Sequence, residues 1–588
     1  MPYLNKPELT RRGLACKVSS SITIKNPGNN INRITVLTKY IHVMIFKILK
    51  QISFTIFLSL LIANVYPCTN LLVTKGASKD GSAFLVYTND GEWLYKLNNT
   101  PAKDHKTGDS LTFKSGRNGV EGKIHQVEHT NAVIGFQMNE YQLAVGETTF
   151  TGREELWNHS KYLEYWHFMT LALERAKTAR EAVDVITSLA EQYGYGSEGE
   201  SFSLVDPNEA WILEMIGTGD EGEGAIWVAM KIPDGYISAH ANMAHIGEFP
   251  LDDPDNCFYS DNVISFAVEK GYYDPKSGEP FRFNDVYNPP SPDRLKYCES
   301  RVWSIFRRSA PSMDLSSDFC RGVEGAERYP LWIQPDEKLG IEDVMALVRD
   351  HYEGTEFDMT KGVDAGPFGT PNRWRPLFWD GEDDEHFSWE RPISTSNTCF
   401  SFIGQMRSWL PDDVGGICWF GVDDTYFTCY VPIYVGNTSV PEPFTIGNIN
   451  KFSRESMWWA FNFVSNFANL KYSYMIEDIR NVQTNLEKNM IAQQDSIANV
   501  ASKLSKKKRE KMLTNYSNAL GEEVHQQWLA LGDALITKYN DGYVKDDNRK
   551  INEVGYPDAW MDELNKVSGD KFKIPDWNKS SRQTDLPY

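Results

Sequence analysis

Residues 68–90 read CTNLLVTKGASKDGSAFLVYTND. The run from Thr69 to Thr74 is apolar and rich in residues that favour strands, and Ala83 to Thr88 is a second run of the same kind. Residues 75–82, between the two runs, contain glycines, serines and an aspartate, a composition typical of a turn. The segment therefore predicts a β-hairpin with Cys68 at the start of its first strand.

A basic and then apolar segment precedes this hairpin and resembles a secretion signal. Lys47 and Lys50 are followed by the apolar residues 52–63. This run matches the length of the apolar central region of a signal peptide and is too short for a membrane span. Met44 is a candidate for the true start of the chain. We therefore predict that residues 1–67 are a leader and propeptide, and that the protein is secreted or periplasmic, exported into a bacterial cell envelope.

Removal of this leader would leave Cys68 with both a thiol and a free α-amine. An α-amine has an ordinary pKa of about 7.7–8.0, so near neutral pH its neutral form can accept the thiol proton. Cys68 is therefore a candidate nucleophile whose base is its own amino group. Pro67 is not a small residue of the kind that signal peptidase prefers, so we expect the last leader residues to be removed autocatalytically.

Asp90 lies just past the second predicted strand. In a hairpin, that position folds back beside the start of the first strand, where Cys68 lies. A carboxylate there could hold and orient the α-ammonium group, so Asp90 is a second candidate catalytic residue.

Three phrases in this segment resemble the start of the secreted cysteine dipeptidases. They are CTNLLV, ASKDGS and YTND, which end at Val73, Ser82 and Asp90. These dipeptidases are N-terminal-nucleophile (Ntn) hydrolases, related to choloylglycine (bile-salt) hydrolases and penicillin V acylases. In the acylase relatives an arginine often stands three residues before the aspartate. Tyr87 occupies that place, so a role for that arginine is not carried over.

A second resemblance lies in residues 146–150, which read GETTF. In the family this segment borders the active site. The resemblance implies that Glu147, Thr148 and Thr149 line the substrate cleft. The alternative is an ordinary strand end that faces solvent.

Two further positions match the family residue for residue. Asn242 corresponds to an asparagine that in relatives helps form the oxyanion hole together with backbone N–H groups. Arg301, in a helix expected to start at Cys298, corresponds to an arginine that reaches the nucleophile's pocket, where a guanidinium could favour the thiolate. The alternatives are an Asx-turn for Asn242 and a surface ion pair for Arg301. His240 and His245 are interpreted as packing or surface histidines.

Several later loops also carry the wording of the dipeptidase branch. Residues 351–355 read HYEGT, residues 365–368 read AGPF, and residues 391–395 read RPIST. Their spacing alone indicates only glycine- and proline-rich segments, which are possible binding loops.

The order of predicted elements indicates an α+β fold. Helices over residues 164–174 and 179–193 lie between groups of predicted strands, an order that suits a four-layer αββα sandwich of the Ntn-hydrolase type. Later elements and boundaries are predicted as follows: closing strands over 398–404 and 416–434; a catalytic domain over 68–450 that ends in a linker; helices over 457–469, 472–500 and 516–539; a basic turn over 503–511; a helical extension over 451–545; and a tail over 546–588.

Charge and cysteine content exclude some classes of protein. The net charge is −20, and residues 1–67 are basic, so the rest of the chain is more acidic still, which argues against a nucleic-acid partner. The sequence contains no cluster of histidines and cysteines with metal-ligand spacing, and we expect neither a metal nor an organic cofactor. If Cys68 is the nucleophile, six cysteines after it could pair in an oxidising compartment.

We therefore expect a secreted dipeptidase that cleaves peptide bonds of dipeptides or short peptides through an acyl-enzyme on Cys68. One alternative is an Ntn amidase or acylase that acts on N-acyl amino acids, bile salts or acyl homoserine lactones. Another is a non-enzymatic surface lipoprotein with Cys68 lipidated, although a lipidation signal needs a small residue before the cysteine. A homo-oligomer is possible, and no stable membrane span is expected.

Overall fold

A computed structural model describes residues 67–382 and 385–574. Its first element is the predicted hairpin, formed by β1 (Cys68–Val73) and β2 (Ala83–Asp90) with Cys68 opposite Asn89. Gly81 in the connection has φ +84°, a left-handed conformation that glycine adopts without strain. The hairpin prediction is confirmed.

The hairpin is the centre of a six-stranded antiparallel sheet. Its strands, in spatial order, are β14 (Ile237–His240), β1, β2, β18 (Thr398–Met406), β19 (Ile417–Val422) and β20 (Val431–Tyr434). Every residue of β1, β2 and β18 is buried. Because both faces are covered, these strands read as continuous apolar runs rather than as an alternating pattern.

A second antiparallel sheet has eight strands. Their spatial order is β15 (Cys257–Tyr259), β13 (Ile226–Lys231), β12 (Ala210–Ile216), β11 (Gly199–Val205), β10 (Ala144–Phe150), β9 (Met138–Asn139), β8 (Val133–Ile134) and β3 (Asn99–Thr100). Gly135, with φ +59°, lies in the tight turn between β8 and β9, which pair with each other.

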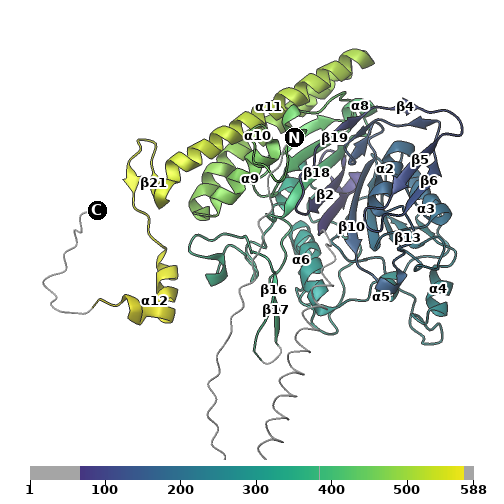
Figure 1. The fold of residues 1–588 in the computed structure, drawn as a ribbon, viewed down its shortest axis with the longest axis horizontal. Helices are drawn as coiled ribbons and strands as arrows, with labels where there is room; N and C mark the ends of the chain where they lie inside the picture. The colour runs from purple at the N-terminus through teal and green to yellow at the C-terminus, as the bar shows by residue number, and fades with distance from the viewer. Residues whose placement is uncertain (1–66, 383–384, 575–588) are drawn as a thin grey trace, which may run out of the picture. The chain divides into compact units, whose positions relative to one another are not determined.

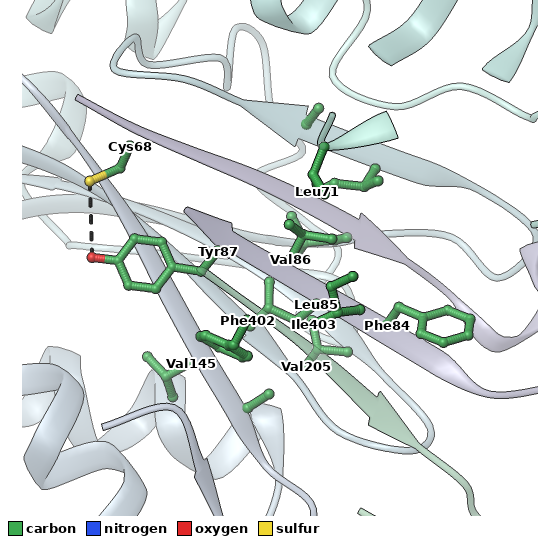
Figure 2. Close-up of a cluster of buried hydrophobic side chains, with 14 of the residues drawn as sticks. Cys68, Leu71, Phe84, Leu85, Val86, Tyr87, Val145, Val205, Phe402 and Ile403 are labelled. Atoms are coloured by element: carbon green, nitrogen blue, oxygen red, sulfur yellow. Dashed lines mark hydrogen bonds between the residues drawn. The ribbon is translucent and has the colours of Figure 1, made fainter. Parts of the chain in front are cut away.

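The two sheets face each other. The side chain of Asn70 in β1 donates to the Glu147 carbonyl of β10 at 2.7 Å, and Thr148 of β10 bonds His240 of β14 at 2.6 Å. Apolar side chains from both sheets, including Leu85 and Val205, fill the space between them (Figure 2). This interface is the core that holds the start of β1 in place.

Helices cover the second sheet and support the predicted α+β class. The structure places α2 (Tyr165–Arg175) and α3 (Ala179–Tyr193) within a residue of their predicted bounds, packed on β10, β11 and β12 (Figure 1). A further helix, α6 (Pro292–Ser309), packs on β14 and begins earlier than expected, since Pro292 occupies a first-turn position that suits proline.

The remaining short elements lie outside these layers. The helices are α4 (Val263–Glu269), α5 (Phe283–Tyr287), α7 (Ile341–Leu347) and α8 (Asp412–Gly415). The two-stranded pairs are β4 (Lys103–Asp104) with β7 (His129–Thr130), β5 (Ser110–Lys114) with β6 (Glu121–His125), β16 (Phe378–Asp380) with β17 (His386–Ser388), and β21 (Val544–Lys545) with β22 (Ile551–Asn552).

The C-terminal part is helical, as predicted, with one correction. Helices α9 (Met457–Ala468) and α10 (Tyr472–Ala501) match their predicted ranges, and α12 (Asp558–Phe572) lies in the predicted tail. The basic run was expected to be a turn, but α11 begins at Lys506 and continues to Tyr539. Lysine, arginine and glutamate are good helix formers, and their charged ends stay in solvent, so the run extends the helix.

These helices are fixed to the first sheet by buried polar contacts. Helix α11 packs on β20, and Glu487 of α10 pairs with Arg349 at 2.6 Å and accepts from the Tyr430 N–H at 3.0 Å. Asp423, in the connection after β19, accepts from Asn462 and Ser465 of α9 at 2.9 and 2.6 Å. The predicted boundary between catalytic domain and helical extension, near residue 450, stays a prediction.

The cysteines after Cys68 form no disulfide among the described residues. The six thiols fill core positions, where cysteine behaves as a small apolar side chain: Cys257, Cys298, Cys320, Cys399, Cys418 and Cys429. The possibility that these six cysteines pair is therefore not realised among the described residues.

Contacts divide the chain into two units, Met1–Val65 and Tyr66–Tyr588. The predicted leader, apart from Pro67, and the last residues of the predicted tail lie outside the described residues. None of the helices in the described ranges combines the length and apolar character that a membrane span requires.

Asp423 generates a prediction about stability and pH. Burial raises the pKa of its carboxyl to about 7, so below that pH the folded state binds a proton that the unfolded state, near pKa 3.8, has released. Its contribution to stability therefore falls as pH rises between about 4 and 7, by up to about 1.4 kcal/mol per pH unit. Asp423→Asn removes this dependence and keeps a residue that tolerates the left-handed φ of +65°.

The measurement is the free energy of unfolding of wild type and variant at pH 5 and pH 7.5. Wild type should lose stability relative to Asp423→Asn over this interval. Glu523→Gln, which changes an exposed carboxylate on α11, is the control and should follow wild type. A constant difference between wild type and Asp423→Asn would contradict the raised pKa.

Candidate active site

Cys68 lies at the buried end of β1, 1% exposed. Its backbone nitrogen donates to Asn242 Oδ1 at 3.0 Å. In this chain Pro67 precedes Cys68, so the nitrogen is a peptide amide. It stands where the α-amine would be in a chain that starts at Cys68.

Polar side chains surround the Cys68 sulfur. The thiol donates to Glu147 Oε1 at 3.3 Å, and Asn89 Nδ2 lies 3.6 Å from Sγ. Figure 2 shows the sulfur directed toward the Tyr87 hydroxyl, 4.0 Å away. Tyr87 in turn donates to Glu147 and accepts from Asn89 Nδ2 at 2.8 Å. The thiol is therefore the centre of a buried hydrogen-bond network.

This environment favours the protonated thiol. Burial raises the pKa of Cys68 well above its ordinary value, and the nearby Glu147 carboxyl raises it further. A thiol is a much weaker nucleophile than a thiolate. Chemistry at this sulfur therefore requires a base that takes the proton at the moment of reaction.

A second carboxyl lies behind Glu147. Burial raises the pKa of both Glu147 and Glu200, and the carboxyl of Glu147 raises that of Glu200 further. Glu147 Oε2 and Glu200 Oε1 meet no donor from other described residues, and the two carboxyl groups are in hydrogen-bonding reach of each other. Two buried carboxyls in such contact hold one proton between them.

The residues predicted to line the cleft are all buried, and each forms a hydrogen bond to another residue of the protein. Glu147 reaches the thiol, Thr148 bonds His240, and Thr149 Oγ1 donates to Glu200 at 3.0 Å. His240 also bonds Ser203 at 2.7 Å, so it is a packing residue between the sheets. A role in substrate binding for these residues stays a prediction.

Asn242 is held in a conformation that aims its carbonyl oxygen at Cys68. Its φ of +62° is left-handed, a region that asparagine tolerates better than most residues. Its Nδ2 donates to the Thr149 carbonyl at 2.8 Å, while Oδ1 accepts from Cys68 N. One of the two Nδ2 hydrogens is thus used within the protein, and the oxyanion role stays a prediction.

Arg301 reaches the same point from α6 and is fully buried. Its guanidinium donates to the Cys68 carbonyl at 2.5 Å, to Thr69 Oγ1 at 3.0 Å and to Asn242 Oδ1 at 3.0 Å. The alternative of a surface ion pair is therefore excluded. Arg301 fixes the backbone of Cys68 and brings a positive charge close to its nitrogen.

Asp90 is buried beside the hairpin end and binds a cation. Its carboxylate pairs with Arg391 and accepts from Thr398 Oγ1 at 2.6 Å, and its backbone N–H donates to the Pro67 carbonyl at 3.2 Å. Burial lowers the pKa of Arg391 to about 9. The structure brings Asp90 next to the Pro67–Cys68 peptide and engages its carboxylate with Arg391; a contact with the α-amine stays a prediction.

Sequence reasoning did not single out Asn89 and Arg391. The hairpin register places Asn89 opposite Cys68, so the alternation of β2 could have indicated both Asn89 and Tyr87. Arg391 comes from a loop far away in sequence, noted only for its dipeptidase-like wording. Arg391 is the cation beside Asp90 in this chain. The acylase relatives often carry an arginine at the position of Tyr87 instead.

The other histidine of this region is buried as well. His245 Nε2 lies 2.9 Å from Glu299, and Glu214 accepts from the His245 backbone N–H at 2.5 Å. The carboxyl of Glu299 raises the pKa of His245 although burial lowers it. Within the described ranges, no group of histidine, cysteine and carboxylate side chains is arranged to hold a metal ion.

Asp90→Asn should lower the free energy of unfolding by about 3–5 kcal/mol, because the buried Arg391 would lose its counter-ion. Thr398→Val removes only a neutral donor to the same carboxylate and should cost about 1–2 kcal/mol. Urea denaturation of both variants and of wild type measures the two effects. An unfolding midpoint for Asp90→Asn equal to that of wild type would contradict the buried pair.

Comparison with known proteins assigns the chain to a family. A family model described as Peptidase family C69 matches residues 67–485. A probable dipeptidase of Salmonella dublin is 27% identical over 66% of this chain and 85% of its own length. Dipeptidase A of Lactobacillus helveticus is 23% identical over 69% of this chain and 82% of its own. The resemblance found in the sequence is confirmed: the chain belongs to peptidase family C69.

Proposed function

We propose that this protein is a dipeptidase that cleaves peptide bonds with Cys68 as an N-terminal nucleophile. The observation that carries the proposal is the position of Cys68, with its nitrogen on Asn242 and its thiol on Glu147. Membership of a cysteine peptidase family and relatives that are named dipeptidases support it. The facing sheets with helices outside also support a four-layer αββα sandwich of the Ntn type.

Export and leader removal are part of the proposal. The apolar segment over residues 52–63 and the cysteine that follows it support secretion or transport to the periplasm. Once the chain begins at Cys68, its nitrogen becomes an amine in the place now occupied by the amide. Asn242 Oδ1 would accept one of the amine's hydrogens and leave the lone pair available.

The charge of Arg301 tunes this amine. A guanidinium that shares the acceptor Asn242 Oδ1 disfavours a second positive charge at the same point. This arrangement would favour the neutral, basic form of the α-amine over the ammonium. Asp90 with Arg391 fixes the neighbouring strand end, and Asp90 would orient the amine as the sequence predicts.

The reaction follows from these positions. The neutral α-amine takes the thiol proton, and the thiolate attacks the substrate carbonyl. Asn89 Nδ2, 3.6 Å from Sγ, has a second hydrogen besides the one given to Tyr87 and is placed to donate to the developing oxyanion, with Asn242 as the donor implied by the resemblance. The ammonium returns its proton to the leaving amine, and water then hydrolyses the thioester.

The alternatives receive less support. An amidase or acylase of the same superfamily would share the chemistry, but the relatives reported above are named dipeptidases. A lipoprotein requires a small residue before the lipidated cysteine, and Pro67 occupies that position.

Cys68→Ala should lower kcat/KM for dipeptides by more than about a thousandfold, since it removes the nucleophile. Cys257→Ala, at another buried cysteine, is the matched control and should keep activity. Iodoacetamide should inactivate wild type, and a saturating dipeptide should slow this inactivation. Dipeptide hydrolysis by the Cys68→Ala variant at the wild-type rate would contradict the assignment.

A further inference from the structure

A cavity of about 490 Å³ opens just past the end of β2, the strand that pairs with β1 through Asn89 and Cys68. Its walls come from the end of β2 and from two loops, residues 371–377 and 390–397. Gly91 N–H donates to the Asn397 carbonyl at 2.8 Å, so the cavity adjoins the strand end that carries Asp90. Its volume is in the range of small-molecule sites.

Most of the charged side chains in the cavity wall are neutralised by the protein. Arg373 pairs with Asp364, Glu390 pairs with Lys296 at 3.1 Å, and Arg391 pairs with Asp90. These pairs fix the walls and add no net charge to the cavity.

Two charges in the wall remain without a partner. Among the described residues, Glu92 and Arg375 form neither an ion pair nor a side-chain hydrogen bond, and both are exposed at the cavity. The cavity therefore offers one free carboxylate and one free guanidinium to a ligand. This pattern is complementary to a zwitterion, which carries one ammonium and one carboxylate group.

A buried donor also lines the cavity. Arg391 is 1% exposed, and its Nε–H has no hydrogen-bond partner among the described residues. A donor buried this deeply is out of reach of a ligand in the cavity, so Arg391 shapes the wall. Recognition of a ligand therefore falls to the exposed charges of Glu92 and Arg375.

We propose that this cavity binds the dipeptide substrate and that Glu92 and Arg375 recognise its two ends. The inference rests on the proposed function. Glu92 lies two residues past the end of β2, the strand whose Asn89 pairs with Cys68. The ammonium of a dipeptide is closer to its scissile carbonyl than its carboxylate is, so Glu92 binds the ammonium and Arg375 the carboxylate.

The same arrangement explains a preference for two residues. A longer peptide would place an uncharged amide at the position where Arg375 binds the carboxylate of a dipeptide. Trp374, 66% exposed beside Arg375, and the buried Leu377 give the wall an apolar part that suits an apolar side chain of the second residue. Selection of dipeptides thus follows from two opposite charges in the wall of one small cavity.

The test compares Glu92→Gln and Arg375→Gln with wild type on three probes: Leu-Leu, N-acetyl-Leu-Leu and Leu-Leu amide. Each variant should raise KM for Leu-Leu about tenfold with little change in kcat, the effect of one partly exposed charge-assisted hydrogen bond. Glu92→Gln should not further weaken the binding of N-acetyl-Leu-Leu, which lacks the ammonium. Arg375→Gln should not further weaken the binding of Leu-Leu amide, which lacks the carboxylate. Probes that are not hydrolysed are measured as competitive inhibitors.

Glu324→Gln and Arg321→Gln are matched controls, since they remove exposed charges outside the cavity and should behave as wild type. If wild type hydrolyses Leu-Leu and both cavity variants keep its KM, the inference is overturned while the proposed function stands. If wild type hydrolyses no dipeptide, the proposed function itself fails. An equal loss on all three probes would also overturn the assignment of separate ends.

Discussion

The hydrogen bond from Cys68 N to Asn242 Oδ1 is the contact on which the site depends. It fixes the nitrogen of Cys68 against the side chain of Asn242, in the loop after β14. Arg301 of α6 donates to the same Oδ1 atom. Three elements far apart in sequence therefore meet at one atom. The second sheet closes the arrangement, because Asn242 Nδ2 is held by the Thr149 carbonyl of β10.

This geometry places polar and charged groups in a dry interior, which is costly unless each has a partner. The protein meets that requirement by pairing Asp90 with Arg391 and by contact between Glu147 and Glu200, with Thr149 as a further donor. In return, electrostatic interactions there are stronger than they would be in water. A positive charge beside the Cys68 nitrogen therefore affects its basicity more than a surface arginine could. In the proposed mechanism no histidine is needed, because burial, Asn242 and Arg301 together prepare the amine of Cys68 as the base.

The sequence predicted the parts of this site that are local or carried by family wording. The hairpin, the start of β1 at Cys68 and the bounds of α2 and α3 follow from apolar runs and turn residues close together in the chain. Asn242 and Arg301 were found by their resemblance to the family, and the structure brings both to Cys68.

Other features could not be predicted because they depend on contacts between distant segments. The role of Arg391 is visible only in its ion pair with Asp90. Glu147 contacts the thiol only because the two sheets face each other. The basic run at Lys506 was misread because charge was taken as a sign of a turn, whereas these residues are strong helix formers. The pairing of six cysteines was a chemical possibility that the positions of the thiols in the core do not realise.

The most direct test of the account is the mass and N-terminal sequence of the catalytically active protein. The account predicts that the active chain begins at Cys68 with an unmodified amino group, and that acetylating this amine abolishes activity. An active protein that retains residues before Cys68, or that carries a blocked amine there, would contradict the central claim, because the thiol would then have no base of its own.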